Sequence, residues 1–201
     1  MNKISRAIFI LLPLLFLCGC STRQFRIGGV QIRSTLPSFV IYTDYADGRW
    51  DFCARYYEAE SPDAAVESVK HGYGATLEEA IEDIENLTGR DMLYMNGAAL
   101  ILGPGITDEK AVELEVLRRH KLYIFKAAEN VAEIDNDYAG ELFIDVMKSA
   151  KSRKLITLIS IDVYLDDLSV SVPEAEISQN AIAIKINPAK NPTGSNHDIG
   201  E

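Results

Sequence analysis

The feature that most constrains the fold of this chain is a pair of strand-like runs on either side of a turn. Residues 38–45 are rich in β-branched and aromatic side chains, and residues 49–58 alternate between two faces. One of these faces would carry Trp50, Phe52, Ala54 and Tyr56. Asp47 and Gly48, which lie between the two runs, are typical of a tight hairpin turn. The sequence therefore predicts an early β-hairpin.

A capped helix is predicted after the hairpin. Thr76 and Glu79 have the spacing of a capping box, in which each side chain accepts a hydrogen bond from the other residue's backbone N–H. Gly89 would end the helix. Its apolar stripe would consist of Leu77, Ala80, Ile81, Ile84 and Leu87. The acidic residues Glu82, Asp83 and Glu85 lie off this stripe, which indicates a solvated face rather than a metal site. The core is expected to include Leu77, Ile81, Ile84, Leu100 and Ile101.

The rest of the chain alternates between strands and helices. We expect strands at 28–33, 65–73, 93–102, 122–127 and 181–186, and helices at 108–120, at 129–134 and from residue 137 or 138 onward. Residues 103–105 read as a turn, and residues 155–168 fit a strand or a helix. Side chains expected to point inward from the later helices are Val112, Val116, Leu117, Leu142, Phe143, Val146, Met147 and Ala150. The pattern predicts a mixed α/β (α+β) fold: a mixed sheet with an early hairpin and three to four packed helices.

The N-terminus reads as a bacterial lipoprotein signal. Lys3 and Arg6 precede the eleven-residue apolar run 7–17, which is shorter than the ~20 residues that a membrane span needs. Residues 17–20, Leu-Cys-Gly-Cys, resemble a lipobox and predict cleavage before Cys20 and attachment of fatty acyl chains such as palmitate to its sulfur. The alternatives are a plain secretory signal and an uncleaved anchor. The expected organisation is a signal peptide at 1–19, a lipidated tether at 20–27, an α/β domain at 28–186 and a disordered tail at 187–201.

Charge and cysteine content exclude several classes of partner and of chemistry. The formal net charge of −10 argues against nucleic acid as a partner, and against adhesion to anionic lipid by charge alone. After processing, Cys53 would be the only free thiol, so no intramolecular disulfide is expected. Its neighbours in the sequence offer no base that would activate it. Cys53 is therefore interpreted as a small apolar filler of a strand rather than as a nucleophile.

The remaining candidates for chemistry are few. His71, His120 and His197 show no metal-ligand spacing, and no Gly-x-Ser-x-Gly elbow is present. Asp166 and Asp167 are adjacent, so their side chains would point apart. The basic residues Lys148, Lys151, Arg153 and Lys154 lie at an expected helix end, where they would complement the helix dipole before they would bind phosphate. We expect no catalytic residue, no metal and no cofactor.

The order of the elements resembles one protein family. Its marks are the segment Gly-Ala-Thr-Leu-Glu-Glu-Ala at 74–80, Leu-Tyr at 93–94 before Ala-Leu-Ile-Leu-Gly at 99–103, and Leu-Tyr-Ile-Phe-Lys-Ala at 122–127. These marks follow a lipobox and a hairpin. Their order is similar to that in the N-terminal domain of Ger(x)C-type spore germination lipoproteins, the C subunits of nutrient germinant receptors. The resemblance spans residues 38–186. The chain has Ser-Thr-Arg-Gln after Cys20, where family members usually have Trp and then an Arg-Glu pair, and the resemblance does not include the family's C-terminal half.

The resemblance implies a non-enzymatic receptor subunit, anchored by lipid on the outer face of the cytoplasmic (spore inner) membrane. Its implied partners are that membrane and integral-membrane germinant receptor subunits. Two other classes stay open: an unrelated envelope solute-binding lipoprotein and a lipid-anchored hydrolase. The chain is short for a two-lobed binding protein, and the missing nucleophile motifs disfavour the hydrolase.

Overall fold

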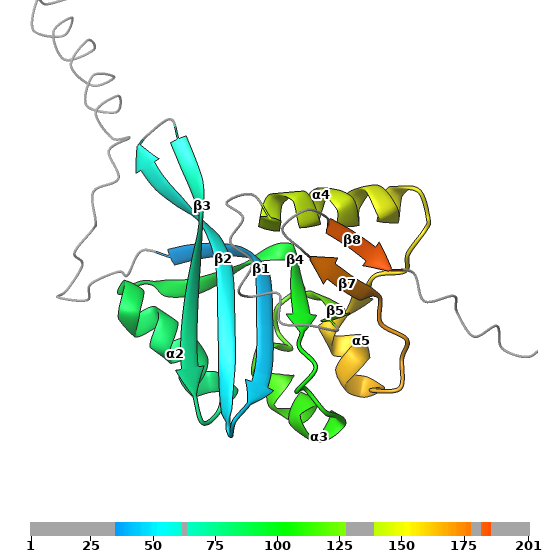
Figure 1. The fold of residues 1–201 in the computed structure, drawn as a ribbon, viewed down its shortest axis with the longest axis horizontal. Coiled ribbons are helices and arrows are strands. Elements are labelled where there is room, and N and C mark those ends of the chain that lie inside the picture. The colour runs from blue at the N-terminus through cyan, green and yellow to red at the C-terminus, as the bar shows by residue number, and fades with distance from the viewer. Residues whose placement is uncertain (1–34, 62–63, 128–138, 178–181, 186–201) are drawn as a thin grey trace, which may run out of the picture. The chain divides into compact units, whose positions relative to one another are not determined.

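The computed structural model describes residues 35–61, 64–127, 139–177 and 182–185 (Figure 1). They form one mixed sheet in the order β3-β2-β1-β4-β5-β7-β8, with β6 paired to β5. The strands are β1 (Thr35–Ala46), β2 (Arg49–Ser61), β3 (Ala64–Gly74), β4 (Asp91–Leu102), β5 (Tyr123–Ala127), β6 (Ile159–Ser160), β7 (Glu174–Ile177) and β8 (Ile182–Lys185). The helices are α2 (Leu77–Thr88), α3 (Asp108–Ala111), the 3-10 helix η1 (Val112–Leu117), α4 (Ala139–Ser152) and α5 (Ile161–Asp166). The predicted α+β class is confirmed.

The predicted hairpin is formed by β1 and β2. These strands pair antiparallel from Ala46 and Arg49 outward, across a two-residue turn at Asp47 and Gly48. Both turn residues have positive φ, 54° and 79°, as a type I′ turn requires. On its other side β1 pairs parallel with β4. The hairpin thus supplies the inner strands of the sheet.

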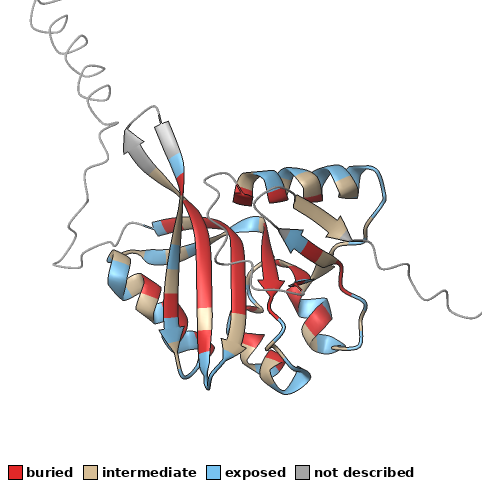
Figure 2. Cartoon of the chain, in the orientation of Figure 1, coloured by how far each residue is buried: buried red, intermediate tan, exposed pale blue. Residues whose placement is uncertain are grey.

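Both faces of the central strands are covered, and Figure 2 shows burial concentrated in β1, β2 and the last part of β4. The first face, here the α2 face, carries Trp50 and Phe52 and packs against α2, η1 and α5. The opposite face, here the α4 face, carries Cys53 and Phe125 and packs against α4. A sheet buried on both sides explains why side chains of both alternating sets in β2 are buried.

The first helix, α2, begins as predicted. Thr76 accepts a hydrogen bond from the Glu79 N–H, and the Glu79 carboxylate accepts from the backbone N–H groups of Thr76 and Ala75. The helix ends before Gly89, whose φ is 66°. The five expected core residues are confirmed: Leu77, Ile81, Ile84, Leu100 and Ile101.

Leu87, however, was wrongly predicted to face the core. It is 67% exposed. Ten residues of α-helix turn through about 1000°, which leaves Leu87 about 80° away from Leu77 around the helix. The apolar stripe therefore stops at Ile84.

The second helix also departs from its prediction. Thr107 caps it as expected, accepting from the Lys110 N–H, but the single helix predicted at 108–120 is the short α3 followed by η1. Three residues per turn of 3-10 helix align Ala111, Leu114 and Leu117, and all three are buried. This changed period turns Val112 and Val116 outward, so their predicted inward orientation is wrong.

In α4, Phe143 and Met147 are buried as predicted, whereas Leu142 is 49% exposed and the prediction for it is wrong. Val146 and Ala150 are half-buried. The helix rests on the sheet through the side that begins with Ala139 and Gly140, which turns Leu142 toward solvent.

The ambiguous region 155–168 forms β6 and α5, the strand near 181–186 is β8, and β7 was not predicted. The expected strand at 28–33, the helix at 129–134, the signal, the tether and the tail lie outside the described residues. Among the described ranges, no helix has the length and apolar character that crossing a membrane requires.

The buried stripe of α2 yields a first prediction. Replacing Ile84, which is fully buried, with Ala should lower the free energy of unfolding by about 2–5 kcal/mol, because the deletion leaves a cavity. Leu87→Ala on the same helix is the matched control and should change it by no more than about 0.5 kcal/mol. Chemical denaturation of both variants measures the difference, and equal losses would contradict this placement of the stripe.

Candidate functional site

A cysteine, a histidine and an aspartate come together on the α4 face of β2 and β3. Cys53 in β2 lies directly opposite His71 in β3, and Asp51 lies two residues away on the same face. The His71 Nδ1 atom is 3.0 Å from an Asp51 carboxylate oxygen. A thiol, an imidazole and a carboxylate in this order are the elements of a catalytic triad.

The electrostatics of the group fix the charge of His71. Its hydrogen bond with Asp51, followed by the influence of the adjacent Cys53, raises the pKa of His71 to about 10, although burial opposes the shift. His71 is therefore an imidazolium at neutral pH. Its ring also stacks on Tyr73, with 6.1 Å between the ring centroids, and the Arg49 guanidinium lies 4.5 Å from the centre of the Tyr73 ring.

Access decides what this group can do. Cys53 is only 1% exposed and belongs to the hydrophobic cluster of the α4 face, so the interpretation of Cys53 as a buried filler is confirmed. Its neighbours in the sequence supply no base, but the strand pairing places His71 of β3 beside it. Among the described residues, the buried Cys53 presents no open surface to a substrate carbonyl. The arrangement acts as a polar link between β2 and β3.

A second polar link closes the turn after β4. The Asp44 carboxylate accepts hydrogen bonds from the Tyr42 hydroxyl at 3.0 Å and from the backbone N–H groups of Tyr45 and Gly105, both at 2.8 Å. Burial, followed by the Asp44 charge, raises the pKa of Tyr42. The Gly-Pro-Gly segment at 103–105 is a turn, as predicted, and Asp44 holds it against the end of β1.

A third cluster joins the sheet to α4. The Glu67 carboxylate in β3 accepts from the Arg55 guanidinium at 2.8 Å and from the backbone N–H groups of Gly140 and Glu141 at 3.1 and 3.2 Å. The Arg55 and Glu67 side chains are 6% and 1% exposed. A Cβ atom on Gly140 would approach Glu67 and Phe39 to within 2.8 and 2.6 Å, so glycine permits this contact.

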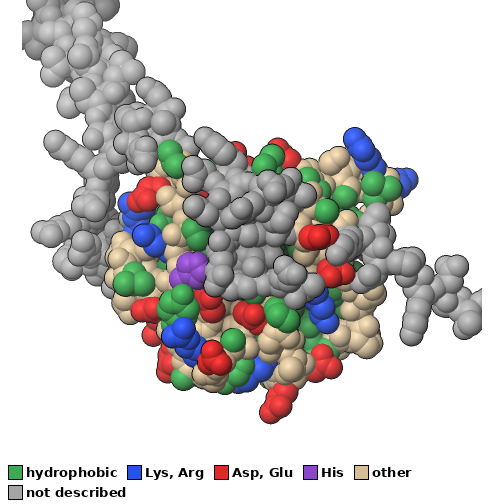
Figure 3. Space-filling model, in the orientation of Figure 1, with side chains coloured by type: hydrophobic (Ala, Val, Ile, Leu, Met, Phe, Trp, Pro, Cys, Tyr) green, Lys and Arg blue, Asp and Glu red, His purple; other side chains and the backbone are tan. Residues whose placement is uncertain are grey.

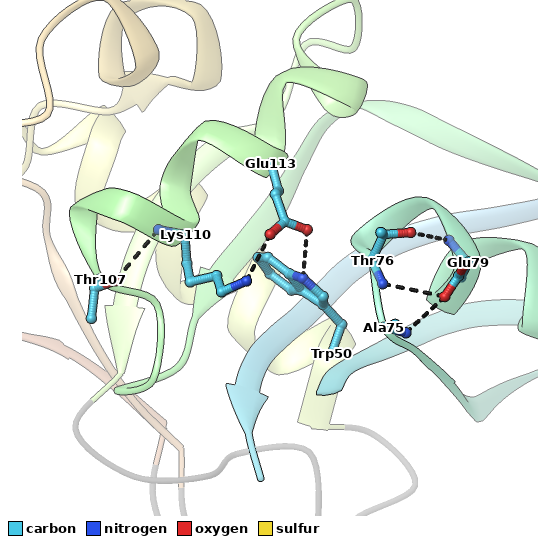
Figure 4. A network of polar contacts seen from close by, with 7 residues as sticks. All are labelled: Trp50, Ala75, Thr76, Glu79, Thr107, Lys110 and Glu113. Carbon is cyan, nitrogen blue, oxygen red and sulfur yellow. Dashed lines mark hydrogen bonds and ion pairs between the residues drawn. The ribbon is translucent and has the colours of Figure 1, made fainter. Parts of the chain in front are cut away.

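A fourth network ties α3 and η1 to the hairpin (Figure 4). The Trp50 indole N–H donates to one Glu113 oxygen at 2.7 Å, and the Lys110 ammonium donates to the other at 2.8 Å. The Lys110 ammonium also lies 3.9 Å from the centre of the Tyr45 ring. Burial raises the Glu113 pKa, but hydrogen bonds from Lys110 and Trp50 outweigh it, so the net pKa is lowered. Glu113 thus stays ionised beside the buried indole.

One small cavity of about 190 Å³ lies beside α2 and η1. Glu78 and Glu82 line one side, Arg119 and His120 line another, and Tyr94 contributes an aromatic wall. Burial, followed by the Arg119 charge, lowers the pKa of His120, so this imidazole is neutral at pH 7. The cavity's volume of about 190 Å³ suits a small solute.

A larger hollow of about 460 Å³ lies along α4 and β8. It is mostly apolar, with Leu142, Val146 and Leu155 on the α4 side and Ile184 on β8, and the charged side chains Asp145 and Arg153 also line it. Across the part of the chain that the structure describes, no group of three or more His, Cys, Asp or Glu side chains is arranged to hold a metal ion. Cys20, the predicted lipid attachment site, and His197 lie outside the described residues.

Comparison with known proteins adds no relative: no family model, no curated protein and no solved structure matches this chain.

The Glu67 cluster yields a prediction about stability. Glu67→Ala should lower the free energy of unfolding by about 3–5 kcal/mol, because it removes the buried carboxylate that Arg55 and the start of α4 share. Glu58→Ala is the matched control on the neighbouring strand, since Glu58 pairs with Arg90 at the surface. That exposed pair should contribute no more than about 1 kcal/mol. Similar losses in the two variants would contradict the assigned role of Glu67.

The charge of His71 yields a prediction about pH. Because the folded-state pKa of about 10 lies above the ordinary 6.5, protonated His71 stabilises the fold fully below pH 6.5, and this contribution is lost as pH rises through about 10. His71→Gln should therefore reduce the melting temperature most at about pH 6, and the gap to the native chain should close near pH 10.

His120→Gln is the control for this measurement. Its pKa is lowered, so protonation of His120 should destabilise the native fold as pH falls below 6.5, and the variant should lose that dependence. A stability gap between the native chain and His71→Gln that does not change with pH would refute the charged state assigned to His71.

Proposed function

We propose that this chain is a lipid-anchored, non-enzymatic subunit of a spore germinant receptor complex. In this proposal Cys20 carries the lipid, the domain stands on the outer face of the cytoplasmic (spore inner) membrane, and integral-membrane receptor subunits are its partners. The observation that carries the proposal is the order of the family-like marks behind the lipobox-like segment at 17–20.

The places of these marks in the fold support the proposal. Residues 74–80 join the end of β3 to the capped start of α2, residues 99–103 close β4, and residues 122–127 contain β5. A Cβ atom on Gly74 would lie 2.5 Å from the Ala80 nitrogen and 2.6 Å from the Glu79 Cβ, so the first mark has a packing reason for its glycine. The marks thus lie at junctions of one packed unit and are not scattered over its surface.

The state of the Cys53 group favours a non-enzymatic role. Among the described residues it is the arrangement most like a catalytic triad, yet its thiol is 1% exposed. The other polar clusters engage their carboxylates in internal contacts: Glu67 with Arg55 and α4, and Glu113 with Trp50 and Lys110. These contacts fit a protein that binds partners through its surface.

The cavity beside α2 favours a second candidate, an envelope solute-binding lipoprotein. Its carboxylates and the opposed Arg119 guanidinium suit a small solute with both charges, but about 190 Å³ is below the ~300 Å³ typical of ligand pockets. Neighbouring genes distinguish the two: genes for multi-spanning membrane subunits support the receptor, and permease and ATPase genes support solute binding.

Gene deletion tests the proposed function. Spores of the deletion strain should form in normal yield but respond slowly, or not at all, to at least one nutrient germinant, while germinants that bypass receptors still act. A native copy should restore the response, and a Cys20→Ala copy should not, because it lacks the acylated sulfur. A host that does not sporulate would refute the proposal, as would normal responses to every nutrient in a strain without other receptor subunits.

A further inference from the structure

The end of α4 concentrates positive charge in an acidic protein. Four of the chain's 20 Lys and Arg residues lie within residues 148–154, and residues 146–158 contain no acidic side chain. In Figure 3, Lys and Arg side chains gather with hydrophobic ones at the upper right of the displayed face, at the end of α4. We define the α4-end patch as Lys148, Arg153, Lys154 and Leu155.

Among the described residues, no carboxylate pairs with the cations of this patch. Arg55, Lys110 and Arg118 each form an ion pair with a carboxylate, and Lys151 next to the patch contacts the Tyr123 ring and hydroxyl. Within the described ranges, the three cations of the patch form no ion pair. In a chain with 30 acidic residues, these three cations are left open to an anionic partner.

The backbone conformation at Lys154 is a second observation about this patch. The N–H of Leu155 donates to the Ala150 carbonyl and that of Lys154 to the Lys151 carbonyl, which is a Schellman ending. Lys154 takes the left-handed position of that motif, with φ 57°, where glycine is the favoured residue. Favourable interaction with the helix dipole accounts for cations in the last turn, but it does not require a lysine at this strained position.

Apolar surface accompanies the charge. Leu155 is 49% exposed and follows Lys154 directly, and it lines the hollow along α4 together with Leu142, which is also 49% exposed. Arg153 lines the same hollow, as does Asp145, which precedes the patch in α4. Half-exposed leucines beside unpaired cations form a surface that suits the boundary between lipid headgroups and acyl chains.

We propose that the α4-end patch rests on an anionic lipid bilayer and thereby orients the anchored domain. The inference depends on the proposed acylation of Cys20, which supplies the affinity for the membrane. Fourteen residues separate Cys20 from Thr35, and their fully extended reach is about 50 Å, so the anchor leaves room for the domain to turn this end toward the bilayer. The acidic remainder of the molecule is repelled by the same surface, which favours this orientation over others.

A fluorescent label on the patch tests the contact. The purified acylated chain carrying Leu155→Cys is labelled with an environment-sensitive dye and bound to vesicles of phosphatidylcholine, with or without about one quarter phosphatidylglycerol. The buried Cys53 should not compete for the dye. We expect the emission to shift to shorter wavelength and to gain several-fold in intensity only with the anionic vesicles, and about 0.5 M salt should reverse the change. A label on Leu87→Cys, an exposed position on α2, is the control and should not respond.

Charge variants separate this role from a structural one. Lys154→Gly should raise the melting temperature, because glycine relieves the positive φ, and yet weaken the response of the label. The triple change Lys148→Gln, Arg153→Gln, Lys154→Gln should abolish the response. Removal of charge elsewhere, by Lys70→Gln with Lys121→Gln, should leave it intact.

Other results of the vesicle experiment would overturn the membrane contact or the lipid anchor. An acylated chain that binds both vesicle types without any change at Leu155 would overturn the inference, as would an equal change in neutral vesicles. A change that appears only when membrane proteins are present would assign the patch to a protein partner instead. A chain that binds neither vesicle type would overturn the proposed lipid anchor, and this inference with it.

Discussion

The placement of α4 on the sheet depends on one contact, which the buried carboxylate of Glu67 makes. This carboxylate lies on β3, is nearly inaccessible, and gathers the Arg55 guanidinium and two N–H groups at the start of α4. Replacing such a pair by apolar residues can be neutral or even stabilising, so its main effect here is to specify where α4 begins and on which face it lies. Through this contact α4 is held with its Phe143 and Met147 against the sheet, and it closes the α4 face.

Coverage of both faces has consequences for where function can reside. The central strands carry Cys53, Tyr42 and Asp44 away from bulk water, so their polar groups need hydrogen-bond partners inside the protein. They do so, and no buried side-chain nitrogen or oxygen in the described residues lacks a hydrogen-bond partner. Groups that still offer free chemistry therefore lie at the periphery, in the small cavity beside α2 and at the end of α4.

The proximity of Cys53 and His71 shows how a small irregularity decides a site. Ser61 pairs with Ala64, but a bulge intervenes and Ala59 pairs with Ala65. Had the first register continued, Cys53 would face Gly72, and His71 would point to the opposite face of the sheet. The alternation in 49–58 predicted which residues share a face within one strand. It could not predict the partner strand's register, because one extra residue reverses every side chain.

The sequence by itself determined the features that depend on a few consecutive residues: the turn at Asp47 and Gly48, the capping box of Thr76 and Glu79, and the stripe from Leu77 to Ile84. Their energies come from backbone geometry and hydrogen bonds within one element. Only the tertiary structure decided that Leu142 faces outward, that Glu67 of β3 binds the start of α4, and that His71 is charged beside Cys53. Each of these depends on strand register and on which neighbour covers which face, and contacts between residues far apart in the chain set both.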